Sequence, residues 1–262
     1  MPHSEPTATA TPEEVLGPPA IPTRAPHESQ PLLAQRSATA RVAGLAGLAA
    51  FDLIVLATFV APPLWNAPGT RSSAGAVALY AQHNATRIVV SLFIYSMAMG
   101  LFLFLAVGVW SRLRQYEPPP HVLSTTGLMA GVALTVLILA AFMPTCVLAY
   151  RHEPSAIAGL LGDMTFGLLA ISGIPTAVFL ASYATVVLRY GGMPRWTAYL
   201  ASASAAAHVL IAASFLSHGP FLSLESGVVV WVPATFFAWI LAVSATLFRG
   251  EPRRAASLLV ST

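Results

Sequence analysis

Long apolar stretches recur along this chain, and they constrain its fold more than any other feature. A helix needs about 18 or more mostly apolar residues to cross the hydrocarbon core of a membrane. Only 9% of the 262 residues are charged, whereas a soluble domain has about 25%. The pattern predicts an all-α polytopic membrane protein with six transmembrane helices, at about 40–62, 88–110, 122–145, 160–188, 196–217 and 227–248.

The segments around these helices carry further signals. The fourth apolar stretch, 156–188, is too long for one straight crossing, and Gly173 and Pro175 predict a kink inside it. Between the first two crossings, residues 74–82 predict a short interfacial helix. We expect one transmembrane domain over residues 37–250 and a second tail at 251–262.

The first 36 residues differ in composition from the rest of the chain. They contain eight prolines and few apolar side chains, which predicts a disordered tail. The acidic residues Glu13, Glu14 and Glu28 could make this tail an arm for a protein partner. A tail that is only solvated is the alternative.

The arginine distribution predicts the orientation in the membrane. Six crossings place both termini on one side, and the tails and loops of that side contain ten of the 13 arginines. Because basic residues accumulate in cytoplasmic loops, we expect both termini in the cytoplasm and a multi-pass chain in the inner (plasma) membrane.

Asp52 stands in the middle of the first apolar run, eleven residues after Arg41. This spacing is about 16 Å along a helix and places the carboxylate near the middle of a hydrocarbon core about 30 Å thick. A carboxylate there costs at least about 2.5–3.5 kcal/mol, so we expect it to face protein or water. The opposite face, where small side chains would let another helix approach closely, contains Ala43, Ala46, Gly47, Ala50 and Ala57.

His208 is the second ionisable residue at depth, twelve residues after Trp196 on the fifth helix. We predict that the first and fifth helices are neighbours, with Asp52 and His208 in contact directly or through one water. Such a pair could act as a proton relay or coupling site, or could be a packing pair. The small face of the first helix, around Gly47, could instead meet the fifth helix and direct Asp52 elsewhere.

On the outer side, Arg87 opens the second helix and Asp163 lies near the start of the fourth. We predict an ion pair between them with a mainly structural role. An exposed pair of this kind contributes only about 0–1 kcal/mol.

Several classes of protein are disfavoured by what the sequence lacks. Paired Cys or His at metal-ligand spacing are absent, and the single Cys146 cannot form an internal disulfide. Haem would need a second deep ligand besides His208. A serine hydrolase built on Ser172 and His208 would need a glycine where Ala170 stands, so we expect no catalytic residue, cofactor or metal. No basic stripe for nucleic acid is present.

The stretch from Thr39 to Arg249 resembles a large group of six-helix bacterial integral membrane proteins, a domain of unknown function. The resemblance lies in Thr39-Ala40-Arg41-Val42-Ala43-Gly44, in the Arg87 start of the second helix, and in Met193-Pro194-Arg195-Trp196. It implies a six-helix inner-membrane bundle and no particular activity or substrate.

Two functions are compatible with these features. The first is a binding, interaction or accessory component of the membrane. The alternative is a small-solute or proton-coupled transporter that uses Asp52 and His208. A continuous polar path from Asp52 to both surfaces would favour transport, whereas a dry bundle in which Asp52 is paired would favour the interaction function. The sequence identifies no small-molecule ligand.

Overall fold

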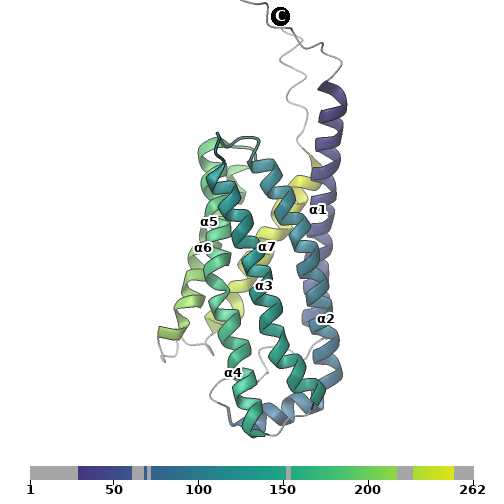
Figure 1. Ribbon diagram of the computed structural model, residues 1–262, viewed down its shortest axis with the longest axis vertical. Helices are drawn as coiled ribbons and strands as arrows, with labels where there is room; N and C mark the ends of the chain where they lie inside the picture. Colours follow the sequence, from purple (N-terminus) through teal and green to yellow (C-terminus); the bar gives the residue numbers. More distant parts are fainter. Residues whose placement is uncertain (1–28, 61–67, 70–71, 152–154, 217–226, 251–262) are drawn as a thin grey trace, which may run out of the picture.

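The computed structural model describes residues 29–60, 68–69, 72–151, 155–216 and 227–250 (Figure 1). Regular structure in these ranges is entirely helical, and six segments are long and apolar enough to cross a membrane. The prediction of an all-α bundle with six crossings is therefore confirmed. The helices are α1 (Ser29–Val60), α2 (Ala74–Leu113), α3 (Val122–Arg151), α4 (Ser155–Ile171), α5 (Gly173–Tyr190), α6 (Arg195–Ala213) and α7 (Gly227–Arg249), and the 3-10 turn η3 (Ser214–Leu216) follows α6.

The predicted kink lies between α4 and α5, which together form the fourth crossing. Pro175 has no N–H to donate to the carbonyl of Ile171, so one rung of the helical hydrogen-bond ladder is missing. The ladder continues on both sides, since Ser172 N donates to Leu168 O at 3.0 Å and Thr176 N donates to Ser172 O at 3.1 Å. The break is therefore local, and the two helices remain one crossing.

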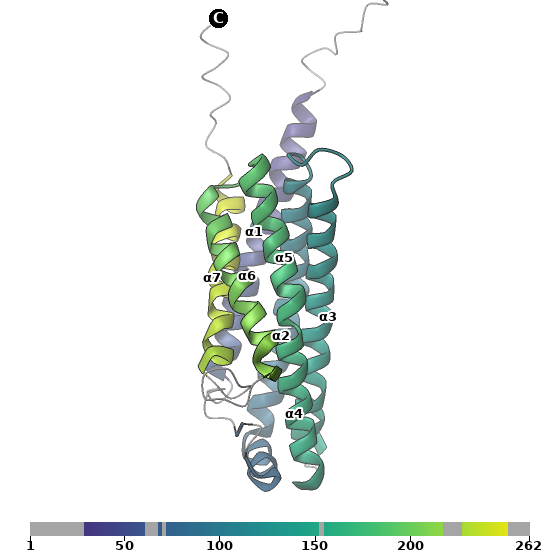
Figure 2. The ribbon, with the colours of Figure 1, turned by 90° about the vertical axis from the view of Figure 1, so that its left-hand side faces the viewer.

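Two helices begin earlier than the apolar pattern predicts. α1 starts at Ser29, because Pro31 falls in the first turn, where a missing N–H breaks no helical hydrogen bond. α2 starts at Ala74, where the Ser73 hydroxyl accepts a hydrogen bond from Ala76 N. The predicted interfacial helix is the first part of α2, which lies across the lower end of the bundle in Figures 1 and 2. The predicted disordered tail is therefore helical over residues 29–36. Residues 1–28 and 251–262 lie outside the described ranges, so for them the tail predictions stay predictions.

The six crossings form a closed ring. Neighbours around it are α1 and α2, α2 and α3, α3 and α5, α5 and α6, α6 and α7, and α7 and α1, while α4 packs on α2 and α3 beyond the kink (Figures 1 and 2). Aromatic side chains fill the centre in edge-on or stacked contacts, with ring centroids 5.1–5.9 Å apart. These side chains are Phe102, Phe179, Tyr183, Phe236 and Trp239, each 7% exposed or less.

α1 joins the ring through its small residues. Ala43, Ala50 and Ala57 are buried against the neighbouring helices. A Cβ added at Gly44 would stand 2.6 Å from Phe248 N, and Gly47 packs against both Ser244 and Leu105. The small face is thus the packing face of α1, but it meets α2 and α7 and not the fifth predicted helix, which is α6.

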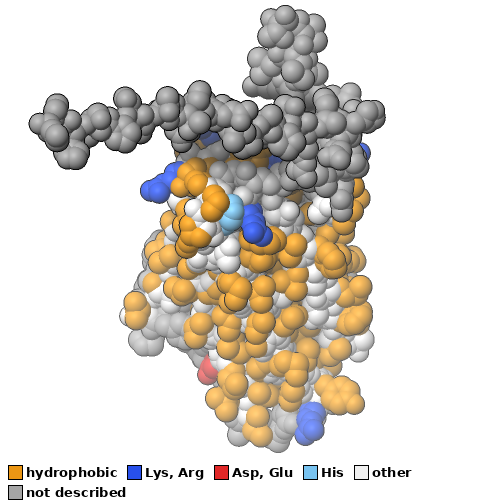
Figure 3. All heavy atoms as spheres, turned by 45° about the horizontal axis from the view of Figure 1, so that its top comes forward, with side chains coloured by type: hydrophobic (Ala, Val, Ile, Leu, Met, Phe, Trp, Pro, Cys, Tyr) orange, Lys and Arg blue, Asp and Glu red, His pale blue; other side chains and the backbone are white. Residues whose placement is uncertain are grey.

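α1 begins and α7 ends at the same end of the bundle (Figure 1). Exposed arginines gather at this arginine-rich end, and Figure 3 shows apolar side chains covering the flank below it. This end carries Arg41, Arg114, Arg189, Arg195 and Arg249.

Candidate functional site

Asp52 lies on the outer surface of the bundle. Its side chain is exposed, as are those of Leu45 and Leu56 on the same side of α1, at 51% and 50%. Its depth is fixed by contacts of α1 with α2, because Gly47 packs on Leu105 at one side of it and Ser91 Oγ donates to Ala57 O at the other. Along the bundle, Asp52 therefore lies between the levels of Leu105 and Ser91 of α2, and its side chain faces away from the protein.

His208 has the opposite environment, since its side chain is only 5% exposed. Nδ1 lies 2.7 Å from Ser204 O, and a carbonyl can only accept, so Nδ1 carries a proton. The ring stands edge-on to Phe236 of α7, with centroids 5.8 Å apart. The Ser204 hydroxyl also contacts Thr235 Oγ1 at 2.9 Å, so this polar group joins α6 to α7.

The kink of the fourth crossing meets α6 at His208. A Cβ added at Gly173 would stand 2.5 Å from the carbonyl oxygen of His208, so a glycine is needed for the two backbones to come this close. Ser172 is engaged within its own helix, because its hydroxyl donates to Leu169 O at 2.6 Å. Ser172 and His208, the pair considered for a serine hydrolase, are therefore not hydrogen-bonded to each other.

The structure does not bring Asp52 and His208 together. α1 packs on α2 and α7, whereas α6 packs on α5 and α7, so α7 separates the two helices. The prediction that they are neighbours is wrong, because the small face of α1 takes the interior position and turns the carboxylate outward.

Arg87 and Asp163 are both exposed and do not meet. α4 contacts α2 where a Cβ added at Gly162 would stand 3.4 Å from a methyl group of Val77, ten residues before Arg87. Ten residues correspond to about 15 Å along a helix. The predicted ion pair is not formed between these described residues.

Glu117 is a carboxylate whose role the sequence did not reveal. It lies in the turn between α2 and α3, is 6% exposed, and accepts hydrogen bonds at 2.8 Å from the backbone N–H groups of Leu123 and Ser124. Burial acts to raise the pKa of Glu117, but the hydrogen bonds from Ser124 and Leu123 and the nearby His121 outweigh it, so the pKa lies below its usual value. The carboxylate caps the start of α3 from five residues before the helix, a spacing that no capping motif predicts.

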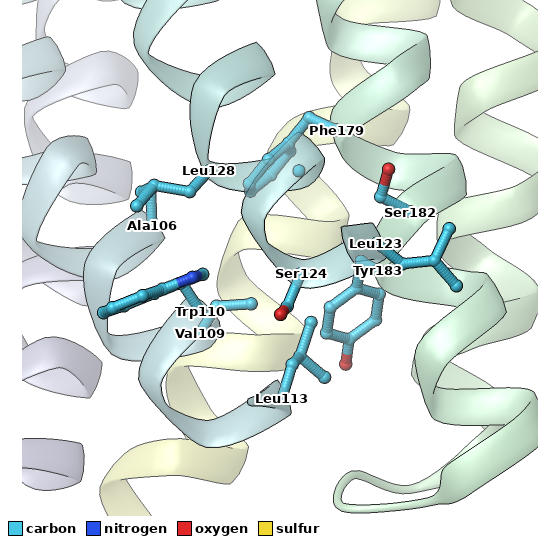
Figure 4. Close-up of a pocket in the computed structure, with 11 residues that line it drawn as sticks. Ala106, Val109, Trp110, Leu113, Leu123, Ser124, Leu128, Phe179, Ser182 and Tyr183 are labelled. Carbon is cyan, nitrogen blue, oxygen red and sulfur yellow. The ribbon is translucent and has the colours of Figure 1, made fainter. Parts of the chain in front are cut away.

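One small cavity lies near the arginine-rich end (Figure 4). Its volume is about 10 Å³, which is room for a single water. Trp110, Phe179 and Tyr183 are among the residues that line it, and Trp110 Nε1 is buried without a hydrogen-bond partner among the described residues. This space is too small for a solute.

No cluster of three or more potential metal ligands occurs in the described ranges.

The long apolar helices and the apolar flank of the bundle define a multi-pass integral membrane protein. No protein-family model, no curated protein and no solved structure matches the chain.

Proposed function

We propose that this chain is a binding or accessory component of a membrane assembly, which contacts its partner within the bilayer through α1. The observation that carries the proposal is the outward position of Asp52 at mid-depth, on a face of α1 that is otherwise apolar. A carboxylate exposed to hydrocarbon costs at least about 2.5–3.5 kcal/mol. A partner that covers and hydrogen-bonds it would remove this cost.

The centre of the ring supports binding over transport. Phe102, Phe179, Phe236 and Trp239 close the centre with buried rings, and the cavity in Figure 4 has room for about one water. The two residues of the transport hypothesis lie on different surfaces, with Asp52 outside and His208 inside. They therefore do not line one pathway between the described helices.

The orientation and location belong to the same proposal. Both termini are cytoplasmic and the membrane is a bacterial inner membrane. The arginine-rich end and the resemblance to six-helix bacterial membrane proteins support this orientation. A reporter fused after Ser217 would report the outer side and one fused after Arg254 the cytoplasm, and the reverse result would overturn this orientation.

Site-directed photocrosslinking in the native membrane tests the interaction. A photoreactive residue at Leu45 or Leu56 should capture one discrete membrane protein. The matched control is Val136 on α3, which is 59% exposed and should give no such product. Equal capture at all three positions, or Asp52-dependent solute flux by the purified chain in vesicles, would contradict the proposal.

A further inference from the structure

We propose that Asp52 is the recognition residue of a docking seam on α1, and that the seam binds a transmembrane helix of another protein with one lysine or arginine at the same depth. This inference rests on the proposed function, because it names the chemistry of the partner at the same surface. It is carried by the spacing of the exposed residues, the surroundings of Asp52, and the charge that a partner must supply.

The exposed residues of α1 follow a coiled-coil spacing. Steps of four and three residues alternate along the seam, so the mean repeat is about 3.5 residues, as in a left-handed supercoil. Most helix pairs in membranes cross with this hand. The seam consists of Ala38, Val42, Leu45, Ala49, Asp52, Leu56 and Phe59, all exposed.

The neighbours of Asp52 on the seam suit a long basic side chain. Ala49, one turn before it, leaves room beside the carboxylate for the stem of a lysine or arginine. Leu45 and Leu56 lie further along the seam on either side and would exclude water from the contact once a helix is docked. The carboxylate would then be paired in an apolar surrounding, where a charge pair is much stronger than in water.

Charge decides between a basic partner and a second copy of this chain. Two copies in one membrane have the same orientation, so a two-fold pair through α1 would place Asp52 against Asp52. Two carboxylates at contact cannot both be charged, and one would have to bind a proton. A basic side chain neutralises the carboxylate directly. α1 does not supply one itself, because the chain has no lysine and the nearest arginine on α1 is Arg41, eleven residues away.

The test uses the full-length chain in phosphatidylcholine vesicles with synthetic transmembrane Leu/Ala peptides that carry lysine, leucine or aspartate at the centre. Energy transfer from labelled chain to labelled peptide measures binding. The lysine peptide should bind about tenfold more tightly than the leucine peptide. Asp52→Asn should abolish this preference, Asp52→Glu should keep it, and Asp52→Lys should transfer it to the aspartate peptide. The control Val136→Asn, a polar change on another exposed face, should keep the preference for lysine.

Equal binding of the lysine and leucine peptides would overturn the inference. So would energy transfer between copies of the chain that depends on Asp52 and that the lysine peptide does not displace, because the occupant would then be a second copy. Crosslinks from Leu45 and Leu56 separate the two proposals. If the crosslinks persist unchanged in Asp52→Asn, the proposed accessory function stands and the proposal of a basic residue in the partner is contradicted. If the unaltered chain gives no crosslinks, the accessory function itself is contradicted.

Discussion

Asp52 on α1 and His208 on α6 are the two ionisable residues that the sequence places deepest in the membrane, and they have opposite surroundings. His208 is 5% exposed and donates to Ser204 O, whereas Asp52 is exposed on the outer surface. Turning α1 by half a turn would bury the carboxylate, but it would push Leu45, Leu56 and Phe59 into spaces that fit alanine and glycine. Overpacking costs about 1–3 kcal/mol for each such side chain. For three side chains this is about 3–9 kcal/mol, a range that begins at the roughly 2.5–3.5 kcal/mol that insertion scales assign to an aspartate and extends well above it.

The comparison teaches that insertion cost alone does not orient a polar residue on a membrane helix. The packing of the opposite face against neighbouring helices competes with the insertion cost, and on α1 the packing decides the orientation. On α6 packing and insertion cost favour the same orientation, because the histidine lies where α5 and α7 both approach closely. The following changes test this contrast.

The largest effect should come from closing the space between α5 and α6. Gly173→Ala places a Cβ 2.5 Å from the carbonyl oxygen of His208, a backbone atom that cannot move without separating the helices. We expect a loss of about 3 kcal/mol in the free energy of unfolding in detergent, followed by tryptophan fluorescence. The matched control is Gly100→Ala on α2, where the added Cβ meets nothing within 4 Å. It should gain about 0.5–1 kcal/mol, and equal losses at the two glycines would contradict the close approach.

Removing the imidazole should have the next largest effect. His208→Ala deletes the contact with Phe236 and the hydrogen bond to Ser204 O and leaves a cavity, so we expect a loss of about 2 kcal/mol in the same assay. The control is His83→Ala on α2, where the histidine is exposed. It should change stability by less than about 0.5 kcal/mol. A neutral His208→Ala would show that the polar group joining α6 to α7 does not stabilise the bundle.

Length and local chemistry explain what could be predicted from the sequence. The crossings depend on the apolar character of about 20 consecutive residues, and the kink depends on the missing N–H of Pro175, so both were predictable. The rotation of α1 depends on Leu105, Ser244 and Phe248, which are distant in sequence. Both faces of α1 can be recognised in the sequence, but the sequence does not show which face fits better against the neighbouring helices.

Glu117 was missed for a related reason. Its carboxylate reaches the start of α3 only because the prolines at 118–120 and a left-handed His121, with φ of 57°, fold the turn back. The spacing from Glu117 to Leu123 and Ser124 therefore follows from the turn conformation, and a search for capping motifs at standard offsets does not find it.

Glu117 offers a pH test of a carboxylate that, unlike Asp52, is fully hydrogen-bonded. Its pKa is lower in the folded protein than in the unfolded chain, where it is about 4.3. Its stabilisation is therefore fully present above that pH and is lost as the pH falls through the lower, folded value. Glu117→Gln should cost about 1 kcal/mol at pH 7 and flatten stability below pH 5, measured by thermal unfolding across pH. An unaltered profile in Glu117→Gln would contradict the cap.

The smallest expected effect is the sharpest test of the separation between Asp52 and His208. Asp52→Asn should change stability by less than about 0.5 kcal/mol, since the carboxylate has no partner among the described residues. Combined with His208→Ala, the two changes should add within about 0.3–0.5 kcal/mol, because α7 lies between the helices. A pair in contact would instead show a coupling of about 0.5–3 kcal/mol. The control cycle is Ser204→Ala with Thr235→Ala, whose hydroxyls are 2.9 Å apart and should be coupled. Coupling between Asp52 and His208, together with additivity between Ser204 and Thr235, would contradict the positions described for these four side chains.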